Sequence, residues 1–197
     1  MDELEAVNVL LGNIGTSPID SLTVGHPDAN AAVRTLRIAA KYVQRKGLWF
    51  NTDYNVYLQP DATTKKILVR SAVSIELQDR SIIKRGDYLY NSSTQTFKFD
   101  ADVFVFKIIS YLDWDDLPDI AKTVALYRAG AEFVRDELED MQLVDLLQRE
   151  EAKANVELTS ENIVNQQLNI FDTPRIRRAR SGVRPFRSRT FFNTPDA

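Results

Sequence analysis

The spacing of hydrophobic residues changes twice along this chain, and these changes constrain the fold more than any single motif. Hydrophobic residues recur at helical intervals up to Gly47, follow a strand-like alternation over residues 49–110, and then return to helical intervals. The outer helices are each too short or too amphipathic to stand alone, so we expect them to pack together. The predicted fold class is therefore α+β: a mostly helical four-helix bundle with an inserted small antiparallel β domain and an extended C-terminal tail.

Four segments follow from this pattern. They are a first half of the bundle (1–48), the inserted antiparallel β domain (49–110), the second half of the bundle (111–170) and an extended tail rich in Arg and Phe (171–197). The first segment is predicted to hold a short helix over residues 3–14 and a longer one after it. We expect Asp28 to cap the longer helix and Gly47 to end it.

The second half of the bundle is predicted to begin at Leu117-Pro118, because proline fits the first turn of a helix. A fourth helix is expected from about Glu139. Val156 and Leu158 break its hydrophobic period, so the sequence leaves open whether it runs continuously to about residue 168 or divides into two.

Short runs of β-branched and aromatic residues, separated by turn residues, predict one small antiparallel sheet between the helices. The run Asp102–Ile109 is the strongest of them. The other predicted strands cover residues 49–58, 66–69, 73–77, 81–83, 85–90 and 96–99.

The residue types that are missing exclude several kinds of site. The chain has no cysteine, which excludes disulfides, thiol nucleophiles and cysteine-ligated metals, and its one histidine, His26, excludes any site that needs two imidazoles. No apolar run is long enough to span a bilayer, and the acidic N-terminus is unlike a signal peptide. We therefore predict a soluble intracellular protein that is not an enzyme and needs neither a metal nor a cofactor.

Two acidic clusters could suggest chemistry. Asp113 could open a calcium loop, but the sixth and twelfth positions counted from it are Pro118 and Val124 instead of Gly and Glu. Asp113, Asp115 and Glu137 could also supply the carboxylate pair of a glycan hydrolase, which stands as one alternative. Helix capping and a solvated charge run explain these residues more simply.

The basic residues are concentrated at the C-terminus. Residues 175–197 carry a net charge of +6, although the whole chain carries −3. Arginines and aromatic residues alternate there, a mixture that docks on protein surfaces or stacks on nucleic acid. We predict that this tail binds a partner through Arg175, Arg177, Arg178, Arg180, Arg184, Phe186, Arg187, Arg189, Phe191 and Phe192. A solvated terminus and a small DNA-binding module that acts through this tail are the alternatives.

An ordered series of motifs resembles the tail tubular protein A family of short-tailed, autographivirus-type phages. The series comprises LEAVNVLLGNIG at residues 4–15, DANAA at 28–32, KGLWFN at 46–51, LQPD at 58–61, RGDYLY at 85–90 and FKFD at 97–100. The spacing is similar over residues 4–135, and the C-terminal third matches only loosely.

The resemblance implies a structural virion protein that is assembled in the bacterial host cytoplasm. It implies a ring of twelve copies between the portal protein and the tail nozzle (tail tubular protein B), with the tail fibre attached nearby. The genome would pass through the ring without specific binding, and no membrane would be involved. As the ring interface we predict the basic residues of the second helix, Arg34, Arg37 and Lys41, against the acidic third and fourth helices.

Overall fold

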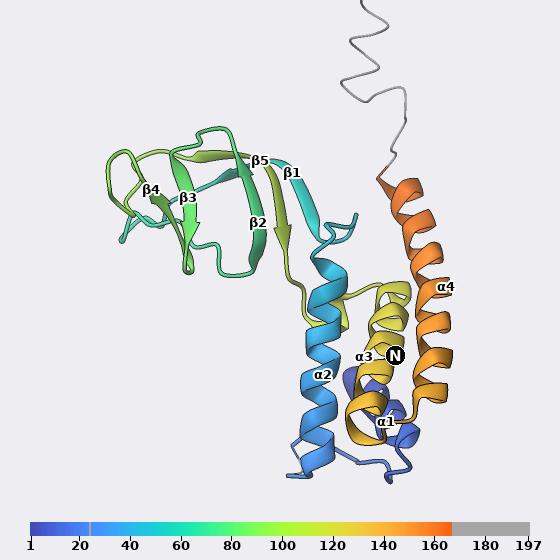
Figure 1. The fold of residues 1–197 in the computed structure, drawn as a ribbon. Coiled ribbons are helices and arrows are strands. Elements are labelled where there is room, and N and C mark those ends of the chain that lie inside the picture. The colour runs from blue at the N-terminus through green and yellow to red at the C-terminus, as the bar shows by residue number, and fades with distance from the viewer. Residues whose placement is uncertain (24, 167–197) are drawn as a thin grey trace, which may run out of the picture.

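A computed structural model describes residues 1–23 and 25–166 (Figure 1). The helices are α1 (Glu3–Asn13), α2 (Pro27–Gln44), α3 (Asp119–Glu137) and α4 (Met141–Asn165), with a 3-10 helix η1 (Trp114–Asp116) before α3. α3 contacts each of the other three α-helices. The α+β class is confirmed, whereas a regular four-helix bundle and the division into four segments stay predictions.

The helix ends show which local signals the chain uses. Asp2 and Glu5 form a capping box at the start of α1. α2 begins at Pro27, with His26 in the cap position and no side-chain cap, so the prediction that Asp28 caps this helix is wrong. Gly47 follows α2 with a φ of +69°, and a Cβ there would lie 2.6 Å from Ile109 Cδ1, so this position needs glycine.

α4 answers the question that the sequence left open, because it is one continuous helix of 25 residues. Its length is therefore about 37 Å. The Asp140 side chain accepts hydrogen bonds from the backbone N–H groups of Gln142 and Leu143 and starts the helix. Leu158 is buried and Val156 is exposed, so the break in the hydrophobic period marks an apolar residue on the solvent side.

The β segment forms two sheets, so the prediction of one sheet is wrong. Its strands are β1 (Thr52–Leu58), β2 (Ala72–Leu77), β3 (Ile82–Arg85), β4 (Tyr88–Asn91) and β5 (Val103–Ser110). One antiparallel sheet has the order β1-β5-β2, and β3 pairs with β4 in a hairpin.

Two of the predicted strands are also wrong. Residues 66–69 and 96–99 make only the single bridges Leu68–Tyr88 and Asn91–Thr96. Lys65 and Gln95, which precede these runs, have φ values of 58° and 54°, so the backbone turns where a strand would have to begin.

Buried polar side chains join the β segment to the helices. The Gln44 side chain donates to the Leu112 carbonyl at 3.1 Å and accepts from the Leu112 N–H at 2.7 Å. Asn51 accepts from the Leu48 N–H at 2.8 Å and donates to the Gln44 and Ser110 carbonyls at 2.9 Å. These bonds connect the end of α2 to the two segments that link the helices to the β segment. One hydrophobic cluster lies among the helices, and a separate cluster lies in the β segment.

Candidate assembly surfaces

One face of α2 carries basic side chains around an apolar strip. Arg34, Arg37 and Lys41 are spaced three and four residues apart and are all exposed, as expected for neighbours on one helix face. Together with Asn30, Val33 and Ile38 they line a groove of about 390 Å³. Ile38 is 55% exposed in it. We call this surface, defined by Arg34, Ile38 and Lys41, the α2 basic face.

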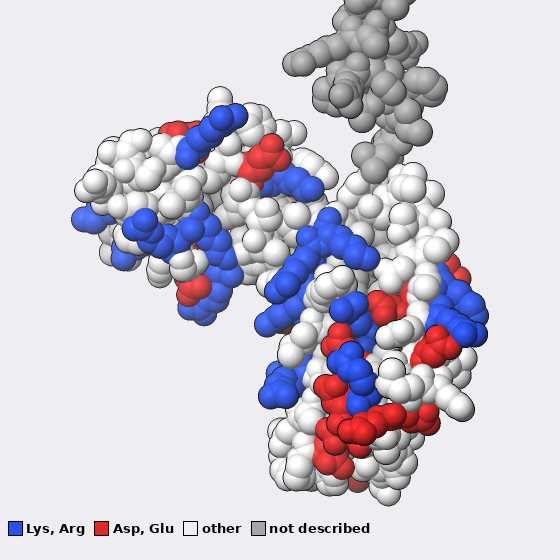
Figure 2. Space-filling view, in the orientation of Figure 1, with Lys and Arg blue, Asp and Glu red and all other residues white. Residues whose placement is uncertain are grey.

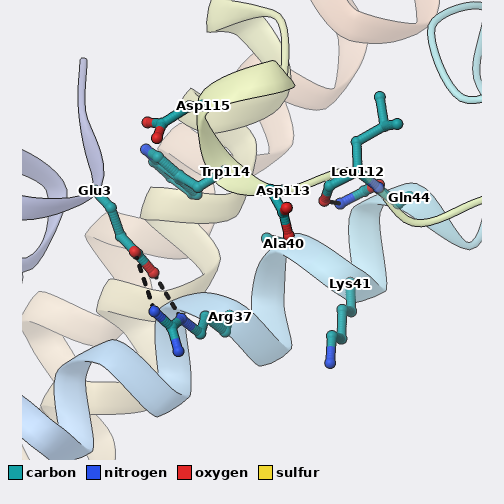
Figure 3. Close-up of a pocket in the computed structure, with 9 residues that line it drawn as sticks. All are labelled: Glu3, Arg37, Ala40, Lys41, Gln44, Leu112, Asp113, Trp114 and Asp115. Atoms are coloured by element: carbon teal, nitrogen blue, oxygen red, sulfur yellow. Dashed lines mark hydrogen bonds and ion pairs between the residues drawn. The ribbon is translucent and has the colours of Figure 1, made fainter. Parts of the chain in front are cut away.

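Arg37 belongs to the α2 groove but already has a partner within the subunit. Its Nε donates to Glu3 Oε1 at 2.7 Å and its Nη2 to Glu3 Oε2 at 3.2 Å (Figure 3). This hydrogen-bonded pair, with the nearby charges of Glu3 and Asp113, raises the pKa of Arg37 above its ordinary value against the opposing effect of desolvation. Arg37 therefore ties α1 to α2 within the subunit.

We expect Arg37→Ala to lower the free energy of unfolding by roughly 0.5–1 kcal/mol, because the substitution removes a two-bond ion pair at the surface. Arg34→Ala, one turn away, is the control. No ion pair of Arg34 is found within the part of the chain that the structure describes, so its removal should cost less than about 0.5 kcal/mol. Urea unfolding of both variants measures these changes. Equal losses of unfolding free energy in the two variants would show that the Arg37–Glu3 pair does not stabilise the fold.

A second cleft, of about 510 Å³, lies between α1, α2 and η1. Its charged lining mixes signs: Glu3, Asp113 and Asp115 face it together with Arg37 and Lys41. Lys41 points away from these carboxylates (Figure 3), and its Nζ lies 5.8 Å from the Tyr111 ring centre. The lining suits polar contact with protein, and Lys41 belongs to the edge shared with the α2 basic face.

The C-terminal half of α4 has the opposite character. Glu157 and Glu161 are exposed, and residues 156–165 include no basic side chain. Apolar side chains accompany them, with Val156 68% and Val164 74% exposed, and Ile163 is exposed as well. The two basic residues nearer the start of α4 are already paired within the helix, Arg149 with Asp145 and Lys153 with Glu150. We call the surface of Val156, Glu157, Glu161, Ile163 and Val164 the α4 acidic face.

The two faces lie on opposite sides of the helical part. α3 lies between α2 and α4 (Figure 1), and it is the helix that both of them contact most extensively. Figure 2 shows Lys and Arg side chains along the edge that α2 forms. The Asp and Glu side chains that it shows on the lower half of the helical part lie away from the upper, C-terminal end of α4. A subunit that carries complementary surfaces on opposite sides can join copies head to tail.

Of the carboxylates considered for hydrolysis, Asp113 and Asp115 line the same cleft, and Glu137 lies far from both. Asp115 lies in η1, before the start of α3, whereas Glu137 is the last residue of α3. A helix of this length separates its ends by about 27 Å, far more than the 10 Å that a glycosidase pair tolerates. Among residues 1–23 and 25–166, no group of three or more potential metal ligands is found.

The predicted partner-binding residues between Arg175 and Phe192 lie outside the described residues. In the described part, no helix is long and apolar enough to cross a membrane.

Surfaces of complementary charge on one subunit are typical of a protein that assembles with further copies or partners. Comparison with known proteins identifies which kind. The tail tubular protein family matches residues 4–168, so the chain belongs to the tail tubular protein family. Tail tubular protein A of Klebsiella phage KP34 is 30% identical over 185 residues, which cover 91% of this chain and 98% of that relative.

Family membership confirms the resemblance read from the sequence and extends it through α4. The chain is a structural component of a phage tail, and its place is the virion. Sequence reasoning missed the Arg37–Glu3 pair and the apolar part of the α4 acidic face. The break in the hydrophobic period at Val156 was the signal for the latter.

Proposed function

We propose that this chain is the adaptor subunit of the tail. In this proposal, copies form a ring, of twelve subunits as in the resemblance, between the portal protein and the tail nozzle. The observation that carries the proposal is the pair of complementary surfaces on opposite sides of α3. The α2 basic face of one copy would pack against the α4 acidic face of the next.

The chemistry of the two faces supports this contact. Each combines exposed branched apolar side chains with charges of one sign: Ile38 lies between Arg34 and Lys41, and Val164 lies near Glu161. Burial of the apolar side chains supplies affinity, while the charges set register and exclude contacts between like faces. Two different patches that meet in this way form a heterologous interface, and such an interface closes into a ring when the rotation per subunit allows it.

The C-terminal tail has a separate role in the proposal. Its arginines and phenylalanines would bind the portal protein or a neighbouring subunit, because guanidinium groups pair with carboxylates and buried aromatics anchor interfaces. The tail fibre would attach near the junction of adaptor and nozzle. The genome would pass through the ring without specific binding, because a strongly cationic lining would hold phosphates in place. Assembly would take place in the host cytoplasm.

Light scattering on the purified protein, alone and mixed with a portal ring, tests the proposal. We expect a portal complex that carries close to twelve copies of this 22.5 kDa chain. If the mixture shows no complex between this chain and the portal ring, the adaptor function is contradicted. A duplex DNA titration over a salt series would then test the alternative, since a DNA-binding module loses affinity steeply as salt rises.

A further inference from the structure

An exposed aromatic cluster lies on the β segment, away from both helical faces. Tyr57 of β1 is opposite Phe104 of β5, and their ring centres are 5.0 Å apart. Phe106 follows on the same strand, 5.2 Å from Phe104 ring to ring. Tyr57 is 65% exposed and Phe106 is 43% exposed. Phe104 thus contacts both of the other rings, and two exposed aromatic rings beside it are typical of a binding surface.

The cluster continues into a groove with acidic walls. Phe104 also lines a hollow of about 380 Å³ together with Gln78, Asp79, Ile82, Asp102 and Val103. Both carboxylates are exposed. The backbone N–H of Ser81 donates to Asp79 at 2.8 Å, and this bond lowers the pKa of Asp79 below its ordinary value. Asp79 is therefore charged at neutral pH. We call the surface of Tyr57, Phe104, Phe106, Asp79 and Asp102 the aromatic groove.

Carboxylates beside aromatic rings select for a particular ligand chemistry. A guanidinium group can stack on an aromatic ring and pair with a carboxylate at the same time. Phenylalanine side chains would add apolar contact with the rings. A peptide that interleaves arginine with phenylalanine is therefore the ligand that this surface fits best.

This chain contains such a peptide. Residues 175–197 hold seven arginines and three phenylalanines and carry a net charge of +6. The described chain ends at Gln166, which lines a hollow with Trp49, Thr52 and Tyr54 at the start of β1. The Trp49 N–H also donates to Asn162 of α4 at 2.9 Å, so this end of α4 adjoins the β segment. The 31 residues beyond Gln166 could span about 100 Å if extended, enough to cross a subunit.

We propose that the aromatic groove binds the C-terminal segment, residues 175–197, of this same protein. Arginines of the segment pair with Asp79 and Asp102, and its phenylalanines pack on Tyr57, Phe104 and Phe106. The inference rests on the proposed role of the segment as a binding arm and names a site for it. Between neighbouring copies, the contact would clasp one subunit to the next at a place distinct from the α2 and α4 faces.

Site-specific cross-linking of the full-length chain tests the inference, because the natural sequence has no cysteine. Gln78→Cys places a thiol in the groove, and Ser188→Cys places one in the segment, next to Arg187. Under mild oxidation we expect this pair to form its disulfide about tenfold faster than a control pair, because docking raises the effective concentration of the thiols. The control pair joins Ser188→Cys to Thr63→Cys, an exposed loop position outside the groove.

Neutralising the groove provides the second measurement. Asp79→Asn with Asp102→Asn should reduce the cross-linking rate about tenfold, while Asp53→Asn with Asp20→Asn, which alters two exposed carboxylates elsewhere, should leave it unchanged. A disulfide within one chain or between two chains supports the site equally. The inference is overturned if the test pair cross-links no faster than the control pair. It is also overturned if replacing Asp79 and Asp102 leaves the cross-linking rate unchanged.

The inference and the adaptor proposal fail in different ways. Light scattering with the portal ring, performed on the same cysteine variants in reduced form, reports assembly independently of the disulfide. A portal complex without specific cross-linking overturns the groove assignment alone. Specific cross-linking without a portal complex supports the groove and overturns the adaptor function.

Discussion

Reversing two charges on the α2 basic face, Arg34→Glu with Lys41→Glu, is expected to abolish ring assembly without unfolding the subunit. Each replacement would bring a carboxylate toward Glu157 and Glu161 of the next copy, and like charges facing each other cost several kcal/mol. The subunit itself should tolerate both changes, because Arg34 and Lys41 are exposed and neither forms an ion pair within the described residues. Portal binding followed by light scattering would show the loss, and circular dichroism would show an intact fold.

Charge exchange supplies the decisive control for that result. A second variant carries Glu157→Lys with Glu161→Lys, and it should also fail to assemble alone. Mixed in equal amounts, the two variants can alternate around a ring of twelve. A reversed α2 face then meets a reversed α4 face, an unchanged α2 face meets an unchanged α4 face, and we expect the mixture to assemble. A variant that carries all four changes restores every contact, so we expect it to assemble again. If all four changes together leave assembly lost, the two faces do not meet. Arg37 is left unchanged throughout, because its reversal would also break the bond to Glu3.

The sequence predicted the helices well because their signals are local. The hydrophobic stripe of α2 and the left-handed glycine after it are set by residues within a few turns of each other. The α2 cap was misread for a local reason too: Pro27 takes the first helical position, which moves the start of the helix one residue ahead of Asp28.

The candidate assembly surfaces are visible in the sequence only in part, because their make-up depends on residues that are distant in the chain. The basic residues of α2 are visible in the sequence, but the pairing of Arg37 with Glu3, 34 positions away in the chain, is not. Asn51 shows the same limit. It was read as part of a strand, although its side chain bonds to Ser110, which is 59 positions away. The aromatic groove likewise requires β1 to lie opposite β5, a pairing that no local pattern reveals.

Asn51→Ala is expected to lower the free energy of unfolding by roughly 3 kcal/mol or more. Asn51 is only 3% exposed, and its side chain bonds three backbone groups at the junction of the helices and the β segment. Alanine leaves a buried N–H and two carbonyls without these partners, and each unsatisfied group costs about 1–3 kcal/mol unless water replaces the bond. Urea unfolding followed by circular dichroism measures the loss.

Two further variants show whether the loss comes from these bonds. Asn91→Ala removes an asparagine that accepts from Ser93 and Thr94 in an exposed turn, so it should cost only about 1 kcal/mol. Asn51→Asp keeps the acceptor for the Leu48 N–H but turns a carboxylate toward the Gln44 and Ser110 carbonyls. Burial and these oxygens would raise its pKa, so stability should recover as the pH falls through the raised pKa and the carboxyl becomes a donor. Equal losses for Asn51→Ala and Asn91→Ala would show that the junction does not depend on this side chain.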